Sequence, residues 1–236
     1  MEFLADLFEW FTDPINWSGT EGIPARLWEH IQYSLIATFI GALIALPLAL
    51  VLGHTGRGGL LAINLTNTGR AIPSLGIIIL VYIAAGLNLL PVYAALVALA
   101  IPPIVTNTYV GIRSVDRGVR ESAEGMGLTG FQVLKDVEIP VAMPLIMAGI
   151  RTSAVQVVAT ATLAAYIGFG GLGRFLIDGL ATFDLAQMTG GAVLVAVLSL
   201  AVEVAFGALQ NALVSEGVAP RKRTATIRAK LGSTTA

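Results

Sequence analysis

The sequence predicts an all-α membrane protein with about five transmembrane helices, its N-terminus outside and its C-terminus in the cytoplasm. Composition is the first observation. Of 236 residues, 56% are hydrophobic and 12% are charged, whereas soluble domains carry roughly 25% charged residues. Cysteine is absent, so neither disulfide bonds nor a thiolate metal site can hold the fold together. We expect packing between membrane helices to do so, and we expect no metal site.

Apolar stretches are the second observation, because a helix needs about 20 apolar residues to cross the hydrocarbon core. The stretches that come close are residues 31–52, 72–87, 91–112, 141–167 and 190–214. The second is short and begins beside Pro73, so we expect it to start deeper in the protein or to be extended by residues 58–69. We therefore expect an outer N-terminal segment (residues 1–30), a membrane domain (31–214) and a basic cytoplasmic tail (215–236).

The distribution of lysine and arginine indicates the orientation, since cytoplasmic flanks carry the excess of both. One side holds Arg57, Arg70, Arg113, Arg117, Arg120, Lys135, Arg221, Lys222, Arg223, Arg228 and Lys230. The other side holds only Arg26 and Arg174. The N-terminus is thus expected outside, and it is expected to be retained because MEFLADLFEWFTDP lacks the features of a signal peptide. The tryptophans suit an interfacial belt on that face: Trp10, Trp17 and Trp28.

The longest expected cytoplasmic loop, residues 114–140, has the pattern of two short amphipathic helices. In the first, apolar residues recur at intervals of three and four, and Gly127 is placed to end it in a left-handed conformation. Thr129 and Gln132 then form a capping box. We expect Pro140 to end the second helix. The two apolar faces are Val115, Val119, Ala123 and Met126, followed by Phe131, Val133, Leu134 and Val137.

The charges of this loop favour a protein partner over a membrane surface. A helix pair lying on lipid would carry mainly Lys and Arg on its polar face. Here bases and acids are balanced: Arg117, Arg120 and Lys135 against Asp116, Glu121, Glu124, Asp136 and Glu138. An apolar stripe with mixed charges is typical of a helix that enters a groove in a soluble partner.

The same loop carries a spaced motif. It reads Glu121-Ser122-Ala123, three residues, Gly127, nine residues, Val137-Glu138-Ile139-Pro140. This resembles the cytoplasmic signature of the permease subunits of bacterial ABC importers: E-A-A, three residues, G, nine residues, I-x-L-P. Ser122, Val137 and Ile139 depart from the signature, but each keeps a small or aliphatic side chain. Residues 70–80 and 149–179 also look like those of the osmoprotectant group, which imports glycine betaine, carnitine, choline or proline.

The resemblance implies a type I ABC importer permease core in the bacterial plasma membrane, surrounded by lipid. It implies that the motif residues couple the permease to ATP-binding cassette ATPase subunits. The other implied partners are a second, identical or similar permease and an extracytoplasmic substrate-binding protein, with no nucleic acid. The sequence contains no G-x-x-x-x-G-K-[ST] phosphate-binding motif. We therefore expect ATP and Mg²⁺ on the partner ATPase, no cofactor on this chain, and no catalysis by it.

Residues 168–173, GFGGLG, match a dinucleotide-binding pattern, but they follow a membrane helix rather than a strand, so we reject that interpretation. Two alternatives stay open. The segment is a flexible outer loop, or its glycines allow close backbone packing near the docked binding protein. The glycines concerned are Gly168, Gly170, Gly171 and Gly173.

Polar side chains recur inside the last two spans. The fourth has Thr152, Gln156 and Thr160, with Ser153 expected on the same face, and the fifth has Ser199, Glu203 and Gln210. Such groups either mediate helix contacts or line a hydrated pathway.

The charged residues inside the spans, Arg151 and Glu203, are costly there unless paired or hydrated. Both lie about 15 Å from the cytoplasmic ends of their helices. We expect an ion pair that joins the two spans or links two permeases, with a gating or substrate role as the alternative.

Recognition of a quaternary ammonium substrate would favour a cage of aromatic faces. Aromatic residues make up 7% of the chain, and every Trp precedes the first span. We therefore expect recognition to reside in the binding protein. An amino-acid importer is an alternative of the same class, and an ATP-independent secondary transporter or channel is one of another class. The latter commonly shows internal repeats around mid-membrane carboxylates, and no repeat is evident here.

Overall fold

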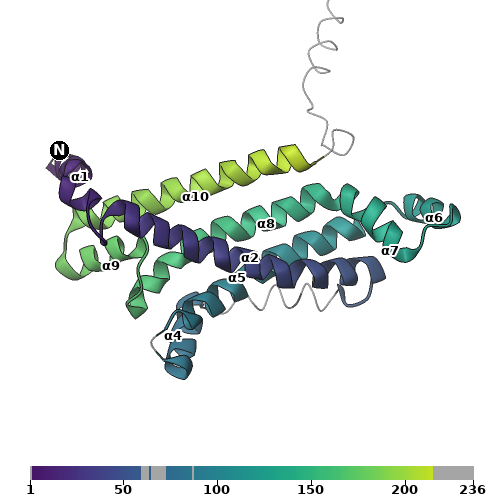
Figure 1. Ribbon diagram of the computed structural model, residues 1–236, viewed down its shortest axis with the longest axis horizontal. Coiled ribbons are helices and arrows are strands. Elements are labelled where there is room, and N and C mark those ends of the chain that lie inside the picture. The colour runs from purple at the N-terminus through teal and green to yellow at the C-terminus, as the bar shows by residue number, and fades with distance from the viewer. Residues whose placement is uncertain (1, 60–63, 65–72, 87, 215–236) are drawn as a thin grey trace, which may run out of the picture.

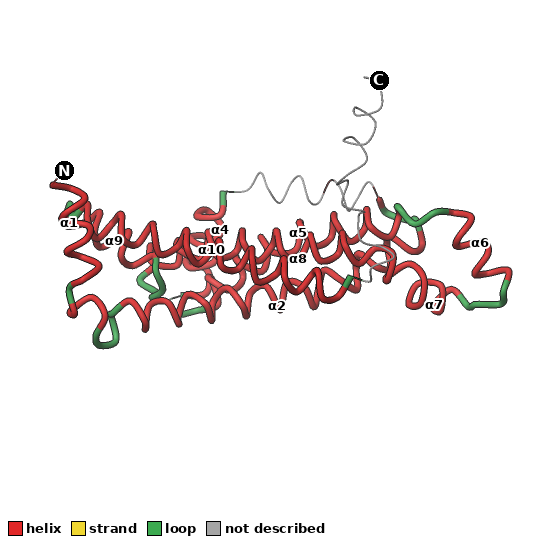
Figure 2. The backbone as a smooth tube through the Cα atoms, turned by 90° about the horizontal axis from the view of Figure 1, so that it is seen from above, coloured by secondary structure: helices red, strands yellow, loops and turns green. Residues whose placement is uncertain are grey.

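The structure is a computed structural model that describes residues 2–59, 64, 73–86 and 88–214. Most of these residues are helical and none of them lies in a strand, which confirms the all-α prediction. The long helices lie side by side along one axis, with α1 and α9 at one end and α6 and α7 at the other (Figure 1, Figure 2). We call these the α1 end and the loop end.

The described residues form a series of helical elements. In chain order they are α1 Glu2–Thr12, η1 Pro14–Trp17, α2 Ile23–Thr55, α4 Ser74–Ala85, α5 Leu90–Arg113, α6 Arg117–Gly125, α7 Gly130–Gln132, η2 Val133–Glu138, α8 Ile139–Ala161, η3 Thr162–Ile167, α9 Gly173–Thr182 and α10 Leu185–Leu213.

Four helical stretches of the described chain are long and apolar enough to cross a membrane: Ile23–Thr55, Leu90–Arg113, Gly130–Ile167 and Leu185–Leu213. They correspond to the first, third, fourth and fifth expected spans. The second corresponds to α4, whose 12 residues are too few to cross alone. Residues 72 and 87, where this span was expected to begin and end, lie outside the described residues, as do the tail 215–236 and most of residues 58–69.

The directions of the long helices agree with a return of the chain between the first and third spans. Helices α2, α5 and α10 end toward the loop end, whereas α8 runs away from it (Figure 1). Because α2 and α5 run the same way, the chain has to return between them, where the second span was expected. The loop of residues 114–140 and the C-terminal end of α10 therefore lie at the same end of the bundle.

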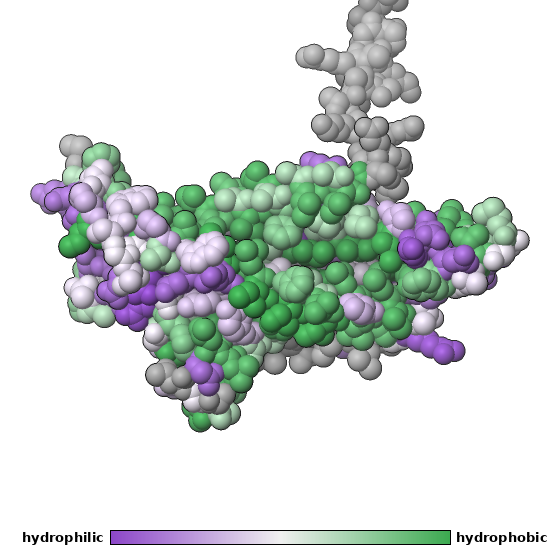
Figure 3. Space-filling view, in the orientation of Figure 1, coloured by the Kyte–Doolittle hydropathy of each residue, from purple (hydrophilic) through white to green (hydrophobic). Residues whose placement is uncertain are grey.

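Small residues set the spacing of the helices. A Cβ added to Gly41 of α2 would lie 2.6 Å from Ala100 Cβ of α5, and one added to Gly149 of α8 would lie 2.8 Å from Asn107 Cβ of α5. Close approach at small residues is how membrane helices pack without a hydrophobic driving force between them. Figure 3 shows hydrophobic residues over most of the middle of the bundle and polar residues gathered toward its ends, as expected of a membrane-spanning bundle.

The tryptophans divide into two kinds. Trp17 and Trp28 are 50% and 61% exposed, as interfacial anchors would be. Trp10 is only 8% exposed, so the prediction that it is an anchor is wrong. Its ring lies against Gly190 of α10 and meets Phe11 and Phe175 edge to face, with centroids 5.0 and 5.4 Å away. Trp10 thus attaches α1 to the bundle.

The prediction that Pro140 ends the second helix of the loop is also wrong, because α7, η2, α8 and η3 form one helical run, Gly130–Ile167. A proline inside an α-helix lacks a hydrogen-bond donor and clashes with the carbonyl four residues earlier. Here the segment before it is a π-helix, in which the Ile139 N–H donates to Leu134 O. Pro140 occupies the first turn of α8, where the missing donor costs least. The wider turn lets the helix pass the proline.

Candidate functional site: the coupling loop and the outer end

The loop of residues 114–140, which we call the coupling loop, extends beyond the bundle (Figure 1). Helix α6 is capped by Asp116, whose Oδ1 accepts hydrogen bonds from the backbone N–H of Gly118 at 2.8 Å and of Val119 at 3.2 Å. Gly127 follows α6 with φ +89°, as predicted for its left-handed position. The predicted capping box is present, since Thr129 and Gln132 bond each other's backbone N–H groups.

The motif residues differ in exposure. Glu121 and Ser122 are exposed on α6 with Gly127 just beyond it, Ala123 is buried, Val137 and Ile139 are half-buried, and Pro140 is exposed. Glu121 Oε1 lies 2.6 Å from Arg117 Nε, one helical turn away. This hydrogen bond raises the pKa of Arg117 above its already high ordinary value, so Arg117 stays charged.

The apolar residues of the coupling loop separate into two sets. Val115, Ala123 and Val133 are buried against the protein, whereas Val119, Met126 and Phe131 are 47%, 76% and 72% exposed. We call the exposed set the apolar tip; it belongs to the same loop as the charged residues of α6. A surface of this kind fits a protein groove better than water.

One residue inside the motif has a role that sequence reasoning missed. The side chain of Glu138 is only 1% exposed, and it meets two basic groups from other helices. Its Oε2 lies 2.7 Å from His54 Nδ1 of α2, and its Oε1 lies 3.1 Å from Arg120 Nε of α6. Arg120 also donates to the carbonyl of Ile112 in α5. Nothing in the sequence indicated that Glu138 is buried, because a glutamate in a charged loop normally indicates a solvent-exposed helix face.

The glycine-rich segment 168–173 lies at the α1 end and is held by α2. The Gly171 N–H donates to Glu29 Oε2 at 2.8 Å, and the Leu172 N–H donates to His30 Nδ1 at 3.2 Å. His30 is fully buried, and its Nε2 lies 2.8 Å from Val158 O of α8. The ring therefore accepts at Nδ1 and donates at Nε2. These hydrogen bonds favour the alternative in which the glycines allow close backbone packing over the alternative of a flexible loop.

Two of these glycines have no room for a side chain. A Cβ on Gly170 would overlap the Glu29 carboxylate, and one on Gly173 would overlap the carbonyl of Thr162. Gly168 and Gly171 have φ values of +84° and +85°, a region that favours glycine.

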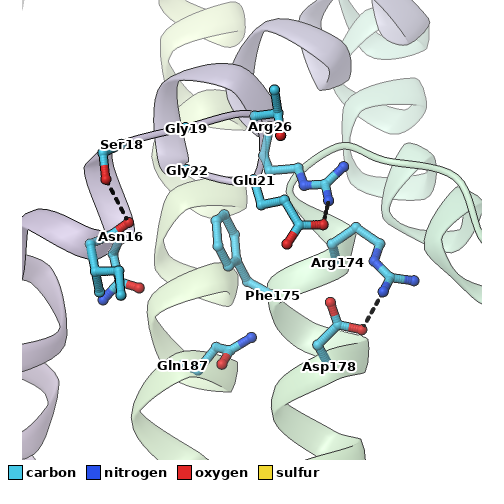
Figure 4. Close-up of a pocket in the computed structure, with 12 residues that line it drawn as sticks. Asn16, Ser18, Gly19, Glu21, Gly22, Arg26, Arg174, Phe175, Asp178 and Gln187 are labelled. Atoms are coloured by element: carbon cyan, nitrogen blue, oxygen red, sulfur yellow. Dashed lines mark hydrogen bonds and ion pairs between the residues drawn. The ribbon is translucent and has the colours of Figure 1, made fainter.

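Beside this segment, a cavity of about 440 Å³ opens between the connection that precedes α2 and the helices α9 and α10 (Figure 4). Two ion pairs lie along its wall: Arg26 to Glu21 at 3.0 Å and Arg174 to Asp178 at 2.7 Å. Its charges are thus balanced in opposite pairs, which suits polar contacts with a protein or a zwitterion rather than binding of a net charge.

Within the bundle, Arg151 Nε of α8 lies 3.3 Å from Glu203 Oε1 of α10, so the expected ion pair joins the fourth and fifth spans. The two side chains are 34% and 44% exposed on the single chain. Gln210 Nε2 of α10 also donates to Pro144 O of α8 at 3.3 Å.

The polar residues of α8 do not share one face. Thr152 is exposed, and Gln156 and Thr160 are half-buried, as is Ser199 on α10. Ser153 is buried and donates to Ala100 O of α5 at 3.0 Å, so the prediction that it lies on the same face is wrong. Adjacent helical residues point about 100° apart, which places Ser153 toward α5 and Thr152 away from it.

Residues 37–216 match the family model described as "binding-protein-dependent transport system inner membrane component". The chain belongs to this family. It is thus a membrane permease component of a transport system. The match includes most of the first span and all of α10, whereas α1, η1 and the start of α2 precede it.

Curated members of the family are similar over most of their length. The carnitine transport permease protein OpuCB of Listeria monocytogenes is 40% identical, covering 82% of this chain and 88% of that protein. The choline transport system permease protein OpuBB of Bacillus subtilis is 37% identical, covering 82% and 89%. The osmoprotectant import permease protein OsmW of Salmonella typhimurium is 32% identical, covering 80% and 91%.

A solved structure gives the fold of this permease independently. An inward-facing structure of the MetNI methionine ABC transporter superposes with a TM-score of 0.71, at 21% identity, over 86% of this chain and 100% of that chain. This permease therefore has the type I ABC importer permease fold. Glu29 and His30, which hold segment 168–173 in this permease, lie before the region that matches the family model.

Proposed function

We propose that this permease carries a compatible solute, such as glycine betaine, carnitine, choline or proline, across the plasma membrane into the cell, driven by ATP hydrolysis on separate ATPase subunits. The observation that carries the proposal is its 36–40% identity, over at least 80% of the chain, to permeases named for carnitine, choline and glycine betaine transport. This chain would bind neither ATP nor Mg²⁺, which belong to the partner.

The geometry of the coupling loop supports the ATPase as partner. Its apolar tip, Val119, Met126 and Phe131, is exposed, as is Glu121, on a part of the chain that extends from the bundle. A cleft in the ATPase that takes up this tip buries apolar surface and meets the charges of α6. ATP-driven movement of the ATPases then moves the loop, and the spans open alternately to the two sides.

Two further partners account for surfaces that a single chain leaves open. Helix α10 presents exposed apolar residues along one side, among them Val197, Leu200 and Val204. On α8, Thr152 is exposed and Arg151 is partly exposed. Apolar residues can face lipid, but charged groups in a span need water or a protein partner. A second permease across a hydrated pathway fits this division, and Gln156 and Thr160 would line the pathway on this chain.

At the α1 end, the cavity of Figure 4 and segment 168–173 support the binding protein as the partner outside. A docked binding protein would deliver the solute, so the pathway needs only weak contacts with it. This agrees with the absence of tryptophan after Trp28. The likeness to the methionine transporter concerns the fold and adds nothing in favour of an amino acid. Membership in a binding-protein-dependent family argues against an ATP-independent carrier or channel.

Uptake measurements test the proposal. The permease is expressed with its ATPase and binding protein in cells that lack other osmoprotectant importers. Radiolabelled glycine betaine, carnitine, choline, proline and methionine are then offered at high osmolarity. We expect uptake of at least one of the first four, abolished when the ATPase cannot hydrolyse ATP. Uptake of methionine alone, or uptake that persists without ATP hydrolysis, would contradict the proposal.

A further inference from the structure

Glu138 occupies the position of the loop motif at which the signature accepts any residue, and its environment is the most buried ionic one among the described residues of the coupling loop. We propose that Glu138 is a positioning residue for transport: with His54 and Arg120 it fixes the coupling loop to the ends of α2 and α5, so that movement of the loop moves these spans. The proposal rests on the proposed function, because it concerns how force from the ATPase reaches the membrane.

The first step is the number of elements that meet at one carboxylate. Glu138 is the last residue of η2 and directly precedes α8. Its two oxygens contact His54, near the end of α2, and Arg120, in α6. Through Nη2, Arg120 donates to Ile112 O in the last turn of α5. One side chain therefore joins the coupling loop to three of the long helices at the loop end, α2, α5 and α8.

The second step is that these contacts cannot be exchanged for water without cost. Glu138 is 1% exposed, and Arg120 is 16% exposed. A buried carboxylate stays charged only when opposite charges and hydrogen bonds replace its hydration. The short distance of 2.7 Å between His54 Nδ1 and Glu138 Oε2 is that of a hydrogen bond. The arrangement therefore holds His54 and Arg120 in defined positions. Separation of the loop from α2 would remove the His54 contact and leave Glu138 with Arg120 alone, whose buried Nε makes no hydrogen bond to the described residues.

The third step is that the chain itself gives the loop little stiffness. Between α5 and α6 the backbone leaves the helix at residues 114–116. On the other side, the loop joins α8 through the π-helical η2, a rare geometry that interrupts the regular α-helical hydrogen bonding. Helix α2 has no short chain connection to the loop, since 84 positions separate His54 from Glu138. Without the Glu138 contacts, a push on the loop would bend these joints before it moved the spans.

The decisive measurement is the amount of solute transported per ATP hydrolysed by the complete complex in membrane vesicles. Glu138→Gln keeps the size of the side chain and removes its charge. We expect it to assemble with the ATPase and hydrolyse ATP, but to transport about fivefold less solute per ATP, in the range of effects seen when contacting residues are separated. Asp136→Asn, an exposed acid two positions earlier, is the matched control and is expected to keep the wild-type ratio. A wild-type ratio in Glu138→Gln overturns the proposal.

Two substitutions of His54 keep the proposal testable where Glu138→Gln does not assemble. His54 lies at the edge of the network and is 27% exposed, so its replacement leaves the Glu138–Arg120 pair in place. His54→Asn can still donate a hydrogen bond near the Nδ1 position, whereas His54→Leu cannot. We expect the ratio of solute to ATP to fall in His54→Leu and to recover in His54→Asn. Equal ratios in the two variants overturn the proposal.

The experiment separates failure of this inference from failure of the proposed function. If the wild-type complex shows no ATP-dependent uptake of any osmoprotectant, the proposed function fails. If the wild-type complex transports solute and the variants transport it with the same ratio to ATP, only the role of Glu138 fails. A double variant, Glu138→Gln with Arg120→Gln, adds a check. Because the two residues share one contact, we expect the double variant to lose no more of the solute-to-ATP ratio than the more affected single variant.

Discussion

Arg151 and Glu203 pair between two spans while keeping 34% and 44% of their side chains exposed on the single chain. A pair buried in hydrocarbon would be costly, but one beside a hydrated pathway or a second permease loses less solvation. The pair therefore fits a surface that faces protein or water. Its contribution to stability is expected to be modest, because exposure screens the attraction.

A double-mutant cycle tests whether this contact stabilises α8 against α10. We expect Arg151→Gln and Glu203→Gln to be non-additive, with a coupling of about 0.6 kcal/mol and no more than about 1.7 kcal/mol, the range measured for polar contacts between membrane helices. The free energy of unfolding in detergent provides the measurement. Combining Glu203→Gln with Arg174→Gln, at the α1 end, provides a control that should be additive. Additive losses for Arg151 and Glu203 would show that the contact contributes nothing.

Gly170 is the second residue whose environment makes a definite prediction. An alanine Cβ there would overlap Glu29 and displace the carboxylate that accepts the Gly171 N–H. We expect Gly170→Ala to destabilise the permease by about 1–2 kcal/mol, the cost of an unmade buried hydrogen bond. It should therefore lower the thermal unfolding temperature as well as transport. Gly125→Ala, with open space around its Cβ, serves as the control and is expected to be neutral or slightly stabilising. An unchanged unfolding temperature in Gly170→Ala would mean that Glu29 does not hold this segment.

At the residue scale, spacing alone could predict some contacts and not others. Arg151 and Glu203 could be paired because their depths follow from helix rise and span boundaries. Glu138 could not, because its partner His54 is distant in sequence and a charged loop normally indicates solvated side chains. Ser153 was misplaced for a related reason. Spacing shows which residues share a helix face, but a residue that lies between two faces can be placed only when the neighbouring helices are known.

The elements of the coupling loop follow from local rules, which is why its two helices could be predicted in detail. Asp116, Gly127, Thr129 and Gln132 act through backbone groups within a few residues of themselves. Pro140 behaves differently. Local rules say that it ends a helix, but the burial of Val133 and Glu138, the first and last residues of η2, favours a continuous helix with a wider turn. Tertiary packing therefore overrides the local preference here.

This explanation predicts the effect of Pro140→Ala. Alanine restores the missing donor, so η2 can close into an α-helix, and α7 then turns by about 100° relative to α8. Gly130, whose Cβ would lie 3.4 Å from His54 Nε2, should move away from α2. Cysteines at positions 54 and 130, in a chain that has no other cysteine, report this with a short thiol-specific cross-linker. Cross-linking should be fast with Pro140 and much slower with Pro140→Ala. Equal rates would show that the proline does not maintain the π-turn.

At the scale of the whole molecule, composition and apolar stretches predicted an all-α membrane bundle correctly, but the second span was harder. Its representative, α4, has 12 residues and packs against α5 and η3. The helix is strongly apolar, so its short length and not its polarity made its boundaries hard to predict. Helix α1 was expected as a separate outer segment, but its attachment to the bundle through Trp10 could not be predicted because it depends on Gly190, which lies far away in sequence.

The orientation of the bundle rests on the distribution of Lys and Arg, and it makes a prediction for the entire chain. Thr20, before α2, and Met126, in the coupling loop, are exposed at opposite ends. In intact cells, a membrane-impermeant thiol reagent should label Thr20→Cys and leave Met126→Cys unlabelled. After permeabilisation both should react, which controls for accessibility of the thiols. The natural absence of cysteine means that each signal reports one position. Labelling of Met126→Cys but not Thr20→Cys in intact cells would reverse the orientation. It would also place the coupling loop out of reach of a cytoplasmic ATPase, so the orientation and the proposed function are tested together.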